Sequence, residues 1–157
     1  MGWVLMTSVR HGAEMFLHAS DVQGPMSNKT LRLIMKETPS VLVLGGPPTY
    51  LKGVTVQGPM IDRGILNAAK ITTVVPTVIF EHHILRSEEW ETEARAVFEA
   101  GNEARNKITT GAGYLNQPTV VLEARRQKLY DEEEPSAEFV KWTQLSREKR
   151  NLMSPPI

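Results

Sequence analysis

The feature that most constrains the fold is a short apolar run that ends in a rigid loop. Residues 41–44 read Val-Leu-Val-Leu and lead directly into Gly-Gly-Pro-Pro at 45–48. A strand whose side chains are all apolar is buried on both faces, which is typical of a parallel sheet covered by helices. Residues 74–80 (VVPTVIF) form a second such run. Pro76 is expected near the start of that strand or at a sheet edge, because it cannot donate a ladder hydrogen bond.

The intervals around these runs carry the other patterns of an α/β chain. Apolar residues recur at helical spacing in the segments 27–38, 61–71, 87–98 and 122–129. Strand-forming residues fill the segments 3–9, 14–19 and 107–110, and the first two flank a turn. The sequence therefore predicts an α/β fold in which a hairpin is followed by alternating strands and helices.

Composition narrows the class of protein. The 157 residues are 41% hydrophobic and 23% charged, which is ordinary globular usage and excludes a disordered chain. Lys plus Arg and Asp plus Glu each number 18, so no overall field attracts nucleic acid or anionic lipid. No run approaches the roughly 18 apolar residues of a membrane span. We expect a cytoplasmic protein without membrane contact, with a main domain over residues 1–134 and a polar tail with one short helix over 135–157.

Chemistry is expected in the loops that follow the strands, because open α/β sheets bind ligands beyond the carboxyl ends of their strands. Those loops hold Asp21, His82 and His83. Taken alone, Asp21 is equally a loop residue before a helix, and the two histidines are a surface pair at a strand end. His18 is expected to serve as a core or hydrogen-bonding histidine rather than as a ligand. The chain has no cysteine, so thiolate nucleophiles and cysteine zinc sites are excluded.

Four blocks of sequence resemble the C-terminal half of an uncharacterised, mainly archaeal family of metallo-β-lactamase-fold proteins. They are HASDVQGP (18–25), GGPPTYL (45–51), EHHILR (81–86) and LEARRQKLY (122–130). The resemblance implies half of an αββα sandwich, in which each half supplies a sheet and its outer helices. It also implies one or two divalent metals at the sheet rim, with zinc favoured.

The resemblance also assigns roles to the candidate residues. Asp21 matches an aspartate that bridges the metals and takes part in catalysis, and His82 or His83 matches a histidine of the second metal. Nothing in the sequence decides which of the two histidines points inward. Carboxylate oxygen and neutral imidazole suit zinc, which generates a hydrolytic nucleophile from water near neutral pH.

Departures from the family pattern shape the functional expectation. The N-terminal signature His-x-His-x-Asp-His is absent from the chain. Glu81, Ser87 and residues 110–113 differ from the residues expected in the family. These changes affect the outer support of the site, because outer carboxylates commonly fix the orientation of a ligating histidine. We expect the C-terminal part of a metal-dependent hydrolase, incomplete or inactive alone, that acts on a small-molecule or phosphodiester substrate.

Two other functions stay open. The chain is alternatively a non-enzymatic interaction module, in which a homo-oligomer or a partner chain covers the exposed half-fold. RNA or DNA processing is a weaker reading, because zero net charge gives it no independent support.

Overall fold

The computed structural model describes residues 4–156, and these form two compact units. The first extends to Ala124 and the second starts at Arg125. Trp3, with which the first predicted strand began, lies outside the described residues. Helix α6, part of the predicted main domain, belongs to the second unit, whose described elements are α6 (Arg126–Glu132), α7 (Ala137–Thr143) and α8 (Arg147–Asn151). The segment 135–157, predicted to hold one short helix, therefore holds two among its described residues.

The first unit is built on a five-stranded mixed sheet with strand order β1-β2-β3-β4-β5. The hairpin strands β1 and β2 are antiparallel, whereas β2, β3, β4 and β5 run parallel. Their bounds are β1 (Thr7–His11), β2 (Glu14–Ala19), β3 (Val41–Gly45), β4 (Thr77–Glu81) and β5 (Lys107–Thr109). The predicted α/β class and its leading hairpin are confirmed.

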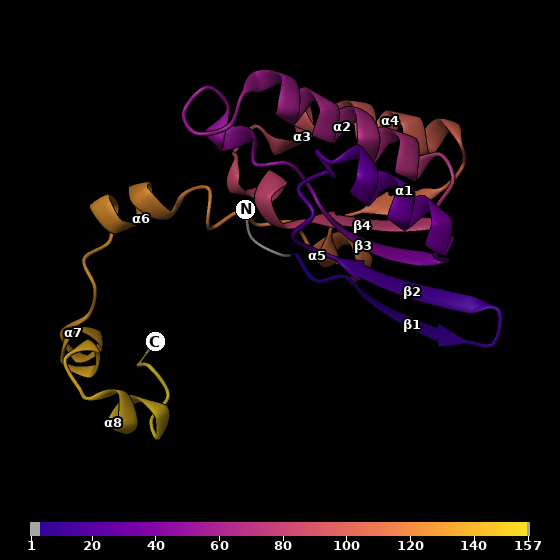
Figure 1. Cartoon of the computed structure of the whole chain (residues 1–157). Helices are drawn as coiled ribbons and strands as arrows, with labels where there is room; N and C mark the ends of the chain where they lie inside the picture. Colours follow the sequence, from indigo (N-terminus) through magenta and orange to yellow (C-terminus); the bar gives the residue numbers. More distant parts are fainter. Residues whose placement is uncertain (1–3, 157) are drawn as a thin grey trace. The chain divides into compact units, whose positions relative to one another are not determined.

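Helices cover one face of this sheet, where α2 packs between α1 and α4 (Figure 1). Helix α5 lies on the opposite side. The helices of this unit are α1 (Asn28–Glu37), α2 (Gly58–Thr72), α3 (Trp90–Glu93), α4 (Arg95–Glu103) and α5 (Gly111–Tyr114). Two short 3₁₀ helices, η1 (Thr49–Leu51) and η2 (His82–Arg86), follow β3 and β4.

The core lies between the sheet and these helices. Paired positions on neighbouring strands place rows of apolar side chains on the helix-facing side, and these rows are Leu17-Leu42-Val78 and Ala19-Leu44-Phe80. His18 points the other way and is exposed, so of its two predicted roles the place in the core is wrong. The reason is the period-2 alternation of β2, which buries its neighbours Leu17 and Ala19 instead.

Two sequence predictions within residues 74–98 need local correction. The strand predicted over 74–80 begins at Thr77, directly after Pro76, as the missing proline N–H requires. The helix predicted over 87–98 is two helices that meet at Ala94, and Ser87 caps neither. Its hydroxyl accepts a hydrogen bond from the Glu89 amide instead. Over residues 4–156, none of the helices combines the length and the hydropathy that a membrane span requires.

Candidate metal site

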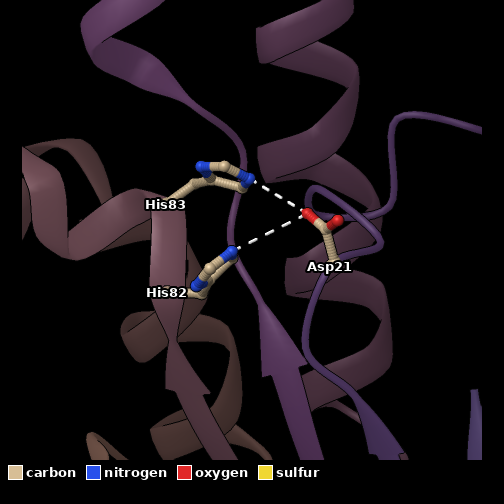
Figure 2. A group of neighbouring side chains, drawn as sticks. All are labelled: Asp21, His82 and His83. Atoms are coloured by element: carbon tan, nitrogen blue, oxygen red, sulfur yellow. Dashed lines mark hydrogen bonds and ion pairs between the residues drawn. The ribbon is translucent and has the colours of Figure 1, made fainter. Parts of the chain in front are cut away.

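The three candidate side chains lie together at the carboxyl edge of the parallel strands (Figure 2). Asp21 follows β2, and His82 and His83 open η2 directly after β4. Strand β3 separates β2 from β4, and all three run in the same direction. Their carboxyl ends therefore deliver both loops to one rim, where one ligand atom from each side chain lies within 4.8 Å of the other two.

Both histidines face the carboxylate. Nε2 of His83 lies 3.0 Å from Oδ1 of Asp21, and Nε2 of His82 lies 3.7 Å from the same oxygen. The side chains differ in exposure: 59% for Asp21, 35% for His82 and 14% for His83. His83 is thus the most buried side chain of the cluster, and Asp21 is the most exposed.

The backbone at His82 explains why two consecutive side chains point the same way. In an extended strand they would point to opposite faces. His82 has a φ of +64°, in the left-handed region that non-glycine residues seldom adopt. This conformation breaks the alternation of β4 and turns both rings toward Asp21 (Figure 2). A non-glycine residue held in this region costs of the order of 1–3 kcal/mol and persists where its surroundings enforce it, often at functional sites.

The glycine pair at the end of β3, Gly45 and Gly46, brings the two loops together. The Gly24 amide donates to the Gly45 carbonyl at 2.7 Å, and the Gly46 amide donates to the Glu81 carbonyl at 2.9 Å. A Cβ atom at Gly45 would overlap the Ser20 carbonyl oxygen. The Gly-Gly sequence therefore permits the close backbone approach that holds the segments carrying Asp21 and His82 next to each other.

A buried amide on α2 anchors the segment after Asp21. Asn67 is 2% exposed, and its Nδ2 donates to the Pro25 carbonyl at 2.9 Å and to Oδ1 of Asn28 at 3.0 Å. Leaving these groups unpaired in the interior would be costly, so the amide fixes the path of the loop. Sequence reasoning missed Asn67, because a polar residue on a predicted helix gives no sign of its partner.

Two further residues surround His83. Oη of Tyr50 lies 3.2 Å from Nδ1 of His83, and Nη1 of Arg86 donates to that same oxygen at 3.2 Å. Ser20 and Glu81 directly precede Asp21 and His82 in the sequence, and the Ser20 hydroxyl donates to Oε1 of Glu81 at 3.0 Å. Tyr50 and Arg86 stand in the blocks GGPPTYL and EHHILR, but the sequence assigned them no role.

The protonation state of His83 suits ligation. Burial lowers the pKa of His83 below its ordinary value of 6.5, and the nearby His82 and Arg86 act in the same direction. The hydrogen bond to Asp21 and the charge of its carboxylate oppose this shift. The lower pKa keeps the imidazole neutral near neutral pH, which is the form that binds metal.

The donor set fits one divalent cation. Two ligands on a tetrahedral zinc stand about 3.4 Å apart, and the 3.0 Å and 3.7 Å separations here bracket that spacing. One carboxylate and two imidazoles also make the three-protein-ligand set that leaves a coordination position open. Within residues 4–156, these three side chains are the only set of histidine and carboxylate groups close enough together to hold a metal. Three ligands suffice for one cation and not for two.

A cavity of about 490 Å³ adjoins the cluster on the His82 side and opens to solvent. Its polar lining comes from Glu81, His82, Arg86 and Glu123, and its apolar lining includes Leu85 and the stretch 120–122. The cavity gives a molecule of moderate size access to the His82 side of the cluster.

Comparison with known proteins relates the chain to archaeal sequences. It is 33% identical over 131 residues to a UPF0282 protein of Korarchaeum cryptofilum, with 83% of this chain and 44% of the relative covered. A UPF0282 protein of Methanopyrus kandleri is 30% identical over 133 residues, covering 85% and 44%. One of Saccharolobus islandicus is 27% identical over 155 residues, covering 98% and 48%.

These relatives agree with the predicted similarity to a mainly archaeal family. The chain spans just under half the length of the curated relatives it matches. No family model matches the sequence, and no solved structure is significantly similar to it. The metallo-β-lactamase fold and the metal role of the cluster therefore stay predictions.

Proposed function

We propose that the chain is the C-terminal part of a metal-dependent hydrolase with a metallo-β-lactamase-like fold. The observation that carries this proposal is the convergence of Asp21, His82 and His83, which come from loops 62 residues apart in sequence. In support, the sheet has helices packed on one face and runs parallel at the site, as half of an αββα sandwich would.

The positions of the three side chains suggest a role for each. Asp21 and the two histidines would hold one divalent cation, with zinc favoured by the mixed oxygen and nitrogen donors. A bound cation of this kind polarises a substrate oxygen and lowers the pKa of water. Asp21, the most exposed of the three, can also accept a proton at the carboxylate oxygen that is left free of the cation.

The substrate would approach from the cavity beside His82. Arg86 offers a cationic group there, and Leu85 with residues 120–122 offers an apolar wall. Glu81 and Glu123 add two carboxylates to the same lining, so a neutral ester with an apolar substituent matches it better than an anionic phosphodiester does. The three side chains supply ligands for one cation, so a two-metal site would need histidines from another segment, such as the additional length of the relatives.

Reconstitution tests this function. An N-terminal half that carries His-x-His-x-Asp-His, taken from a longer relative, is co-expressed with this chain and assayed on bis-p-nitrophenyl phosphate and on p-nitrophenyl acetate. We expect hydrolysis that requires a divalent metal and is abolished by Asp21→Ala. Asp62→Ala, which removes an exposed carboxylate paired with Lys52, is the matched control and should leave the rate unchanged. Metal-independent hydrolysis, or equal loss in both variants, contradicts the proposal.

A second candidate function rests on the other face of the sheet. Val9 is 58% and Phe16 is 39% exposed there, and Val41, Val43 and Ile79 are half-buried. Apolar faces of this kind are association sites. We propose that a second copy of the chain or a partner covers this face, as an interaction module would require.

Analytical ultracentrifugation tests the association of two copies. We expect a dimer that Phe16→Glu converts to a monomer, whereas Leu33→Glu, at an exposed leucine of α1, leaves it intact. A wild-type chain that stays monomeric at high concentration contradicts self-association.

A further inference from the structure

The contact between Tyr50 and His83 goes beyond the ligand set. Tyr50 lies in η1, and its Oη is 3.2 Å from Nδ1 of His83, the ring nitrogen that faces away from Asp21. Arg86 donates to the same Oη at 3.2 Å. His83 and Arg86 are three residues apart on η2, and side chains at that spacing lie one above the other on a 3₁₀ helix. The helix thus presents both side chains to one tyrosine oxygen.

The tyrosine oxygen matters because the position of the hydrogen on the His83 ring decides which ring nitrogen can bind a cation. A neutral ring carries one hydrogen, so a lone pair at Nε2 for a cation requires the hydrogen at Nδ1. That N–H needs an acceptor, and ligating histidines usually donate it to a carboxylate, a backbone carbonyl or water. A phenol oxygen has two lone pairs, of which Arg86 occupies one. Without metal, the Asp21 carboxylate can only accept, so Nε2 carries the ring hydrogen and the Tyr50 hydroxyl donates to Nδ1. When a cation replaces the hydrogen at Nε2, the hydroxyl can turn so that its second lone pair accepts the hydrogen of Nδ1.

We infer that Tyr50 is a positioning residue, which holds the His83 ring with Nε2 toward Asp21 and accepts the hydrogen of Nδ1 when a cation is bound at Nε2. Arg86 holds the tyrosine oxygen in place as an acceptor. This role rests on the proposed function, since it concerns the same cation. Tyr50 would also orient a ligating histidine from outside the ligand set. The family residues expected at positions 81 and 87 would otherwise provide such support, and Glu81 and Ser87 replace them.

The two histidines differ in this respect. Among the side chains of residues 4–156, Asp21 is the hydrogen-bonding or ion-pair partner of the His82 ring, through Nε2. In the described part of the chain, no side chain stands at Nδ1 of His82 as Tyr50 does at Nδ1 of His83. Removing the tyrosine oxygen should therefore weaken the contribution of His83 to metal affinity and leave the contribution of His82 unchanged. This difference separates the role of Tyr50 from a general loss of the site.

Isothermal titration with Zn²⁺ provides the test. Tyr50→Phe keeps the ring and should weaken zinc affinity about 10- to 100-fold, the usual cost of losing an outer partner. Tyr130→Phe, at an exposed tyrosine of the second unit, should leave the affinity unchanged. The effect of Tyr50→Phe should persist in a His82→Gln background and vanish in a His83→Gln background, because residues that act through one another are non-additive.

Nuclear magnetic resonance of ¹⁵N-histidine-labelled chain gives an independent readout. With Zn²⁺ added, the Nδ1 proton of His83 should exchange slowly in the wild type and rapidly in Tyr50→Phe. Equal zinc affinity in the wild type and Tyr50→Phe, or an equal loss in both histidine backgrounds, overturns the role of Tyr50 while the metal site stands. A wild-type chain that binds no Zn²⁺ overturns the metal site itself, and the role of Tyr50 with it.

Discussion

Nε2 of His83 lies 3.0 Å from Oδ1 of Asp21, although the two residues are 62 positions apart in the sequence. Two parallel strands, β2 and β4, end at the same edge and bring them together across β3. The chemistry proposed for the chain depends on this approach, because a carboxylate and an imidazole at such a distance can share a cation.

The two histidines should both act as ligands. His82→Gln and His83→Gln should each weaken Zn²⁺ binding, because either change leaves two protein ligands where a zinc site of this kind uses three. Calorimetric titration measures the affinity of each variant. His11→Gln, at an exposed position in the hairpin, is the control. If one of the two variants binds zinc as the wild type does, that histidine is not a ligand.

Gly45 should tolerate no side chain. In Gly45→Ala the new Cβ overlaps the Ser20 carbonyl, so the segment that carries Asp21 must shift. We expect a loss of unfolding free energy of about 1–3 kcal/mol, the usual cost of overpacking, together with weaker zinc binding.

Urea unfolding measures the stability change at Gly45. In the matched variant Gly111→Ala, the new Cβ meets its nearest atom at 3.8 Å, an ordinary contact. This variant should unfold close to the wild type. Equal stability of Gly45→Ala and the wild type would mean that the backbone approach at Gly45 is looser than described.

His83 should make the metal-free protein less stable in mild acid. Its pKa is below 6.5 in the folded state, mainly because of burial, so the unfolded chain binds more protons between the two pKa values. The contribution of neutral His83 to the free energy of unfolding is complete above pH 6.5. It is lost as the pH falls through the pKa of His83 in the folded state.

Urea unfolding in EDTA at about pH 7.5 and about pH 5 measures this loss. The difference between the two conditions should be larger for the wild type than for His83→Gln. An NMR titration that places the pKa of His83 above 6.5 would contradict the expected direction.

Much of the fold follows from local pattern. The apolar run 41–44 predicted a buried parallel strand, and the alternation of 14–19 predicted the second strand of the hairpin. Each rests on a period that one segment displays by itself. The division of the helix at Ala94 was not predictable, because apolar spacing continues through the break and packing decides where the helix ends.

The site was predictable in its members but not in its arrangement. Parallel strand ends and residue chemistry pointed to Asp21 and the histidine pair. Both histidines face Asp21 because the backbone at His82 is left-handed. No sequence pattern predicts this conformation. Tyr50 and Asn67 act through tertiary contacts with distant segments, and no local pattern reveals such partners.

Zinc stoichiometry tests the central claim most directly. The purified 157-residue chain is loaded with Zn²⁺ and dialysed, and its metal content is measured by elemental analysis beside that of Asp21→Asn and the control Asp62→Asn. The account predicts one zinc per chain in the wild type and in Asp62→Asn, and none in Asp21→Asn. A wild-type chain that retains no zinc, or one that holds two tightly as a monomer, would contradict it.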